Sequence, residues 1–239
     1  MSILGKIADA LTGLAESSPL SGLIGQVAGH LGIDISPSDA SDGGKNQVAF
    51  TIAFISLSAK MAKADGLVTD DEVEAFREVF DVKPSEFRNV ERVFNFARQD
   101  VAGFDAYARQ VAGLFKSNPG ILEDVLDGLF HIAKADGVFH ENELLYLQSV
   151  AEIFGFSDGE FARIKASHLG PDEADPYLIL GVDPSISDDG LRRAYRRLVQ
   201  ENHPDRLIAR GVPEDFIELA NQKLAAINAA YDVIMKDRG

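Results

Sequence analysis

The side chains best suited to binding chemistry lie near the carboxyl terminus of this chain. Four arginines share one helical stretch in two columns spaced by four residues, and a His-Pro-Asp sequence follows that stretch at once. Like charges at that spacing destabilise an isolated helix by about 0.2–0.5 kcal/mol per pair, which favours a binding role; an ordinary solvated face is the alternative. Proline keeps the residue before it out of the helical conformation, which predicts an exposed turn carrying an imidazole and a carboxylate. The candidate binding residues are Arg192, Arg193, Arg196, Arg197, His203, Pro204 and Asp205.

A second set of candidates lies at two acidic turns that belong to an internal repeat. Met61-Ala-Lys-Ala-Asp-Gly66 recurs as Ile132-Ala-Lys-Ala-Asp-Gly137, at an offset of 71 residues, and a glutamate follows each copy. If the two turns meet in the fold, their carboxylates could hold a hard cation such as calcium. The alternative, which we favour, is helix capping with a solvated acidic rim. The candidate cation ligands are Asp65, Glu72, Asp136 and Glu143.

Composition and motifs argue against several other classes of function. The chain has no cysteine, which excludes disulfides, thiolate catalysis and cysteine-type zinc sites. Its 38 acidic and 23 basic side chains give a net charge of -15, the opposite of what a general nucleic-acid-binding protein needs. The sequence contains no nucleophile elbow, phosphate-binding loop, zinc-protease motif or EF-hand. We therefore expect neither an enzyme nor a nucleic-acid-binding protein, and no cofactor other than the cation considered above.

The elements that position these residues are predicted to be helices throughout. Apolar residues recur at helical spacing, the separators are rich in Gly, Pro, Asp or Asn, and no segment alternates as a strand does. Gly66 and Gly137 are expected to adopt the left-handed conformation at helix ends. The expected helices span 48–64, 70–80, 84–97, 104–116, 119–135, 141–154, 158–167, a short segment from 176, 191–202 and a long segment from about 213.

Loop-rich stretches at 36–46 and 170–175 divide the chain into three expected parts. These are an apolar, glycine-rich segment with its linker (1–45), a helical domain (46–169) and a carboxyl-terminal domain (170–239). Charged residues interrupt the apolar residues 1–33, and the longest uncharged run, 17–33, is shorter than the roughly 20 residues of a membrane span. We expect this segment to pack without crossing a bilayer, in a cytoplasmic protein. Association with the cytoplasmic face of the inner membrane through residues 1–33 and homodimer formation are alternatives.

Two stretches of the chain resemble known families. The pattern KADG-x-V/F-x-x-x-E, present twice, resembles the tellurite-resistance TerB-like domain over roughly residues 46–168. DPYLILGV, LRRAYRRL, HPDR and INAAYDVI resemble the J-domain of DnaJ-type co-chaperones over residues 175–239. The combination is similar to the DjlA-like co-chaperones, which join a TerB-like domain to a C-terminal J-domain.

The resemblance implies a helical bundle with an internal two-fold repeat, followed by a J-domain helical hairpin that stimulates the ATPase of a DnaK-type chaperone. The candidate binding residues would face that chaperone, and the TerB-like half would give localisation or specificity for an unidentified client or stress signal. Two alternatives stay open: a TerB-like protein that binds a metal or stress ligand, with an accessory J-domain, and a membrane-tethered scaffold. The segment between HPDR and AAYDVI is longer than in the common J-domain. The hairpin core implied by the resemblance comprises Tyr177, Leu180, Tyr195, Leu198, Ile227, Tyr231 and Ile234.

Overall fold

A computed structural model describes residues 43–65 and 103–239, and every regular element in these two ranges is helical. The predicted all-α fold is therefore confirmed for the described part of the chain. The apolar segment 1–33 and the expected helices 70–80 and 84–97 lie outside the described residues, as does Gly66 at the end of the first repeat copy. The elements are α3 (Gly43–Asp65), α6 (Phe104–Leu114), α7 (Pro119–Ala133), α8 (Glu141–Phe154), α9 (Asp158–Leu169), α10 (Pro176–Ile179), α11 (Asp188–Glu201), α12 (Pro204–Arg210), the 3-10 turn η1 (Glu214–Phe216) and α13 (Ile217–Arg238).

Local signals in the sequence set the ends of several helices. Ser157 and Ser187 cap α9 and α11, because their hydroxyls accept hydrogen bonds from backbone N–H groups in the first turn. Gly137 has the predicted positive φ, +89°, but it lies in the turn beyond the C-cap of α7, Lys134, and so does not itself end that helix. Helices α6 and α7 nevertheless end at Leu114 and Ala133, each two residues before the periodicity predicts, since tight turns follow both.

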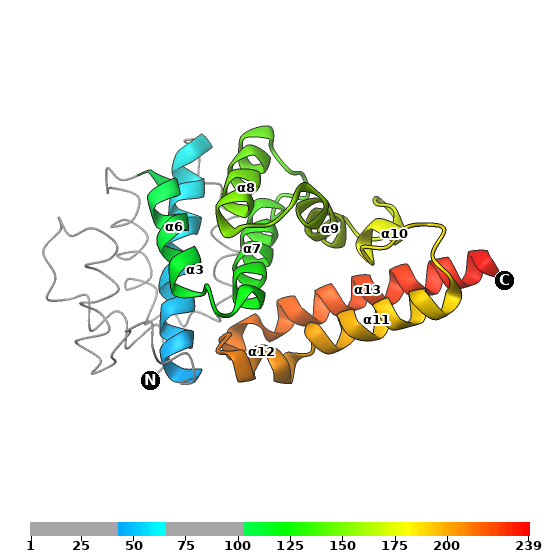
Figure 1. Ribbon diagram of the computed structural model, residues 1–239. Coiled ribbons are helices and arrows are strands. Elements are labelled where there is room, and N and C mark those ends of the chain that lie inside the picture. The colour runs from blue at the N-terminus through cyan, green and yellow to red at the C-terminus, as the bar shows by residue number, and fades with distance from the viewer. Residues whose placement is uncertain (1–42, 66–102) are drawn as a thin grey trace, which may run out of the picture.

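Helix α3 belongs to the amino-terminal bundle and contacts α6, α7 and α8 (Figure 1). Every residue from Ala49 to Met61 is buried, so α3 has no polar face along this stretch. Tyr146 of α8 donates its hydroxyl to the carbonyl of Leu57 at 2.7 Å and so fixes α8 against α3. None of the described helices, the 23-residue α3 included, is long and apolar enough to cross a membrane.

Helices α11 and α13 form an antiparallel pair that extends away from the bundle, with the carboxyl terminus at its far tip (Figure 1). Its core contains the expected Leu180, Leu198, Ile227 and Ile234, and α9 adds Ala166 to it. The three tyrosines expected in this core are instead half-buried at its edge, because their hydroxyl ends reach the surface. These tyrosines are Tyr177, Tyr195 and Tyr231.

Tyr195 and Tyr231 still join the two long helices. Their rings stack with centroids 4.1 Å apart, and the Tyr195 hydroxyl donates to the side-chain oxygen of Asn228 at 2.9 Å. The final helix begins at Ile217 and not near Pro213 as predicted, since η1 takes up the intervening turn.

Candidate functional site

Helix α11 presents its four arginines to solvent while Leu191 and Leu198 are buried on its opposite side. Arg192 lies 3.5 Å from Asp189 in an exposed ion pair of a kind that contributes little to stability. The fold therefore gathers all four predicted basic residues on one open surface, as their spacing requires. We call this surface the arginine face; it consists of Arg192, Arg193, Arg196 and Arg197.

The His-Pro-Asp sequence, here called the HPD motif, follows α11 directly and begins a new helix. The prediction of an exposed turn was wrong in this respect, because Pro204 is the first residue of α12 and His203 is its N-cap. Proline suits this position, since its fixed φ is already helical and the first N–H groups of a helix have no intrahelical partner. His203 caps the helix through Nδ1, which accepts a hydrogen bond from the backbone N–H of Asp205 at 3.2 Å.

The geometry of the HPD motif leaves the side chains of His203 and Asp205 accessible. The side chain of Asp205 is 91% exposed and that of His203 is 55% exposed. Because Nδ1 accepts the capping hydrogen bond, a neutral His203 carries its proton on Nε2. A carboxylate and an N–H donor are thus held on an ordered backbone, beside the end of the helix that bears the arginine face.

Two further residues position this site, and neither was identified from the sequence. Asn202 is buried between α11 and α12, and its side-chain amide donates to the carbonyl of Leu198 at 2.8 Å. It satisfies a carbonyl in the last turn of α11 and so fixes where the HPD motif begins. A polar residue directly after a helix is a common cap, and this signal could have identified Asn202 from the sequence.

Arg238 performs a similar task at the other end of α11. Its guanidinium donates to the Tyr177 hydroxyl at 3.1 Å, to the carbonyls of Ile186 and Pro184 at 2.8 and 3.0 Å, and to the Asp188 carboxylate at 2.9 Å. These bonds tie the end of α13 to the loop that precedes α11. Arg238, in the last turn of α13, therefore fixes the start of the arginine-bearing helix α11.

The structure describes the side chains of two of the four candidate cation ligands. Asp136 accepts hydrogen bonds from the backbone N–H of Val138 and from Nε2 of His140, and both lower the pKa of its carboxyl. Glu143 is buried and accepts from the backbone N–H of His140 at 3.0 Å, as a capping residue of α8 does. The side chains of Asp65 and Glu72 lie outside the described residues. Within the described ranges, no three His, Asp or Glu side chains are grouped so as to hold a metal ion.

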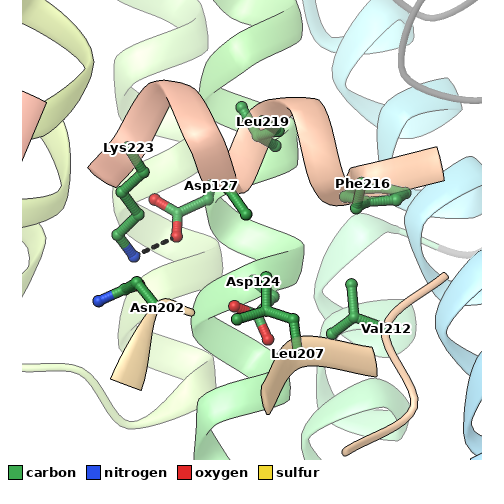
Figure 2. A pocket seen from close by; sticks show the side chains of 9 residues that line it. Asp124, Asp127, Asn202, Leu207, Val212, Phe216, Leu219 and Lys223 are labelled. Carbon is green, nitrogen blue, oxygen red and sulfur yellow. Dashed lines mark hydrogen bonds and ion pairs between the residues drawn. The ribbon is translucent and has the colours of Figure 1, made fainter. Parts of the chain in front are cut away.

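A buried cluster of charges joins the two halves of the chain at α7. Lys223 Nζ of α13 lies 2.6 Å from Glu123 and 2.5 Å from Asp127, and Arg210 Nη2 of α12 lies 2.9 Å from Asp124. Figure 2 shows Lys223 reaching towards Asp127, with Asp124 beside α12. The partners are 86 to 100 residues apart in sequence, so no local pattern indicated this junction cluster, which consists of Glu123, Asp124, Asp127, Arg210 and Lys223.

Burial and charge act differently on the carboxyls of the junction cluster. Burial raises the pKa of Asp124 to about 7, and outweighs the opposing attraction of Arg210 and Lys223. Oδ2 of Asp124 has no hydrogen-bond partner among the described residues, and a cavity of about 10 Å³ adjoins it (Figure 2). Burial also acts to raise the pKa of Asp127, but Lys223 and His168 hold it below its ordinary value. The surroundings of Asp127 therefore favour its charged form, whereas the burial of Asp124 disfavours it.

Comparison with known proteins gives two matches along the chain. Residues 51–166 match the family described as Tellurite resistance protein TerB, and residues 175–238 match the DnaJ domain. The chain is 27% identical to Co-chaperone protein DjlA of Photobacterium profundum, over 98% of this chain and 99% of that protein. It is 26% identical to Co-chaperone protein DjlA of Coxiella burnetii over 100% and 99%, and 24% identical to that of Escherichia coli K12 over 82% of each chain. No solved structure matches the chain.

Proposed function

Because this chain joins a TerB domain to a C-terminal DnaJ domain and resembles Co-chaperone protein DjlA over its whole length, we propose that it is a J-domain co-chaperone that stimulates ATP hydrolysis by a DnaK-type chaperone. The observation that carries the proposal is the exposed HPD motif next to the arginine face, inside the segment that matches the DnaJ domain. This function requires no catalytic residue in the chain, because the hydrolysed bond lies in the nucleotide of the partner.

The arginine face provides the first step, which is association. The chain as a whole carries a net charge of -15, so an acidic partner is repelled by most of its surface and attracted by these four guanidinium groups. Such a distribution selects one orientation of approach and raises the association rate. The antiparallel contact with α13 keeps the four side chains on one rigid helix.

The HPD motif provides the second step, which is recognition at short range. The exposed carboxylate of Asp205 can accept charge-assisted hydrogen bonds from a guanidinium or ammonium group of the partner. The N–H at Nε2 of His203 is a donor for the same surface, while Nδ1 keeps the start of α12 in place. In this proposal the motif stabilises the hydrolysis-competent state of the partner.

We assign to the TerB half the selection of a location, a client or a stress signal. The domain order supports this assignment, together with the placement of the HPD motif: Leu207 on α12 packs into the bundle, while Asp205 stays open to solvent.

The central test is Asp205→Asn in the full chain, assayed for stimulation of ATP hydrolysis by the DnaK-type chaperone of the same organism. The change removes the charge of a side chain that is 91% exposed, so we expect the fold to persist and the stimulation to disappear. Asp158→Asn is the matched control, because Asp158 is also an exposed aspartate in the first turn of a helix, on the TerB half. Full stimulation by the Asp205 variant would refute the assigned function.

A second test concerns the arginine face. Reversing Arg193 and Arg197 to Glu is expected to weaken chaperone binding by about tenfold or more at low salt, and to flatten the dependence of affinity on salt. Reversing Arg109 and Lys116, two exposed basic residues of the TerB half, changes the net charge equally and is expected to leave binding near its original value. An affinity for the chaperone that changes neither with the charge reversal nor with added salt would show that the arginine face is an ordinary solvated surface.

A further inference from the structure

Helix α12, which begins within the HPD motif, is anchored outside the core of its own domain. The hairpin core contains residues of α10, α11 and α13, and no residue of α12 belongs to it. Leu207 of α12 is 6% exposed and belongs instead to the core of the TerB half, as does Val212 just after the helix. Helix α12 contacts α3 of the TerB half as well as α13 of its own domain. The segment that the sequence shows to be long for a J-domain is therefore the one that packs into the TerB half.

An aromatic contact secures the same segment. The ring of Phe216 meets the rings of Phe50 and Phe54 of α3 edge-to-face, with centroids 4.6 and 5.0 Å apart. Gly128 of α7 makes room for these rings, since a Cβ at that position would lie within 3 Å of the ring of Phe54 and 3.0 Å from that of Phe216. A glycine inside a helix costs about 1 kcal/mol relative to alanine, so its presence here is explained by this close approach.

The junction cluster makes the docking specific. Arg210 at the end of α12 is paired with Asp124, and Lys223 of α13 is paired with Glu123 and Asp127, with most of these side chains buried. Buried ion pairs add little net stability compared with apolar contacts, but a shifted arrangement would leave a buried charge without its partner. The two helices that flank η1 are thus held in one register on α7.

We infer that the TerB half completes the DnaJ half: the TerB core and the carboxylates of α7 hold α12 in place and so position the HPD motif for the chaperone. Leu207, Gly128, and the Asp124–Arg210 pair are positioning residues, since none of them belongs to the exposed motif itself. The consequence for the chaperone rests on the proposed function, whereas the anchoring of α12 does not.

The anchoring of α12 should affect how ATPase stimulation depends on the chaperone concentration. If α12 loses its anchor, the HPD motif is ordered in only a fraction of the molecules. The apparent affinity for the chaperone is then the intrinsic affinity multiplied by that ordered fraction. Saturating chaperone restores the ordered state, so the maximal stimulation is kept. A weakened anchor therefore raises the concentration for half-maximal stimulation and leaves the plateau unchanged, whereas loss of the Asp205 charge removes the plateau.

The test uses the full chain with one substitution on each side of the contact. Leu207→Ala removes the apolar anchor of α12, and Leu178→Ala is its control, because Leu178 lies in the DnaJ half with its side chain partly exposed. Gly128→Ala places a methyl group against the ring of Phe54 and, less closely, against the ring of Phe216 that packs on it, and Gly113→Ala is its control, because a Cβ at Gly113 meets no atom within 4 Å. Each protein is measured by amide hydrogen exchange over residues 203–216 and by titration of chaperone ATPase stimulation.

We expect both anchor variants to accelerate exchange over residues 203–216 by at least about tenfold, while α8 and α11 keep their protection. The concentration for half-maximal stimulation should rise by at least about threefold in both, with the plateau retained. Both controls should match the original protein, and Asp205→Asn should lose stimulation with unchanged exchange.

Three results would overturn the inference: unchanged exchange over residues 203–216 in both variants, acceleration spread evenly over α8 and α11, or local acceleration without any rise in the half-maximal concentration. A failure of the proposed function is distinguishable from these, because the original chain would then not stimulate the chaperone at all, while hydrogen exchange would still report on the anchor.

Discussion

The buried carboxyl of Asp124 makes the stability of this protein depend on pH in a way that one substitution should remove. Asp124→Asn replaces a group whose pKa is raised to about 7 with a neutral side chain of the same shape. The remaining side-chain oxygen can still accept the hydrogen bond from Arg210 that Oδ1 now accepts at 2.9 Å. The charged groups that face Asp124 are Arg210 and Lys223, which favour its ionisation, and Asp127 and Glu123, which oppose it.

The direction in which stability changes with pH follows from how many protons the folded and unfolded states bind. The ordinary pKa of 3.8 applies to the unfolded chain, so between about pH 4 and pH 7 the folded protein holds a proton on Asp124 that the unfolded chain has released. The contribution of this group to stability is therefore greatest below about pH 4, falls as the pH rises to about 7, and is constant above that. A difference of about three pH units corresponds to about 4 kcal/mol of unfolding free energy.

The measurement is urea unfolding of the original protein and of Asp124→Asn at several pH values from 4 to 8. The free energy of unfolding of the variant minus that of the original protein should rise by about 4 kcal/mol across this range. Subtracting the two free energies cancels the titration of groups that both proteins share. The neighbouring carboxyls of Asp127 and Glu123 have lowered pKa values, which favours their charged form across this pH range. Asp158→Asn, at an exposed position, supplies the baseline. A difference that stays flat with pH would refute the reasoning that burial dominates at Asp124.

Three other outcomes are expected. Arg238→Ala should lower Tm by about 2–4 °C, because it removes four hydrogen bonds that hold the loop before α11, whereas Lys236→Ala, exposed on the same helix, should leave Tm unchanged. Millimolar calcium or magnesium should not shift Tm, since Asp136 and Glu143 already accept local hydrogen bonds; a rise reversed by chelator would establish the cation site. The full chain should stay in the supernatant after carbonate extraction, because charges interrupt its apolar amino-terminal segment, and recovery in the pellet would contradict this.

The sequence by itself determined the helices and many of their ends, because the forces that set them are local. Apolar spacing predicted α8 at its observed bounds, and Ser187 caps α11 through a hydrogen bond to a backbone group three residues away. The exposed arginine columns and the HPD motif beside them were also visible in the sequence, since both are continuous along the chain. The conformation of the motif was predicted incorrectly: the residue before Pro204 is extended, as expected, but that same geometry serves as a helix N-cap.

Tertiary structure alone decided how the two halves meet and what their buried charges do. Glu123, Asp124 and Asp127 occur in an ordinary acidic helix, and their basic partners are 86 to 100 residues away. Burial is a property of the assembled fold, so the raised pKa of Asp124 and the lowered pKa of Asp127, three residues apart on one helix, have no counterpart in the sequence. The anchoring of α12 in the core of the TerB half likewise depends on side chains distant in the chain, because packing energy is fixed by contacts in space and not by order along the sequence.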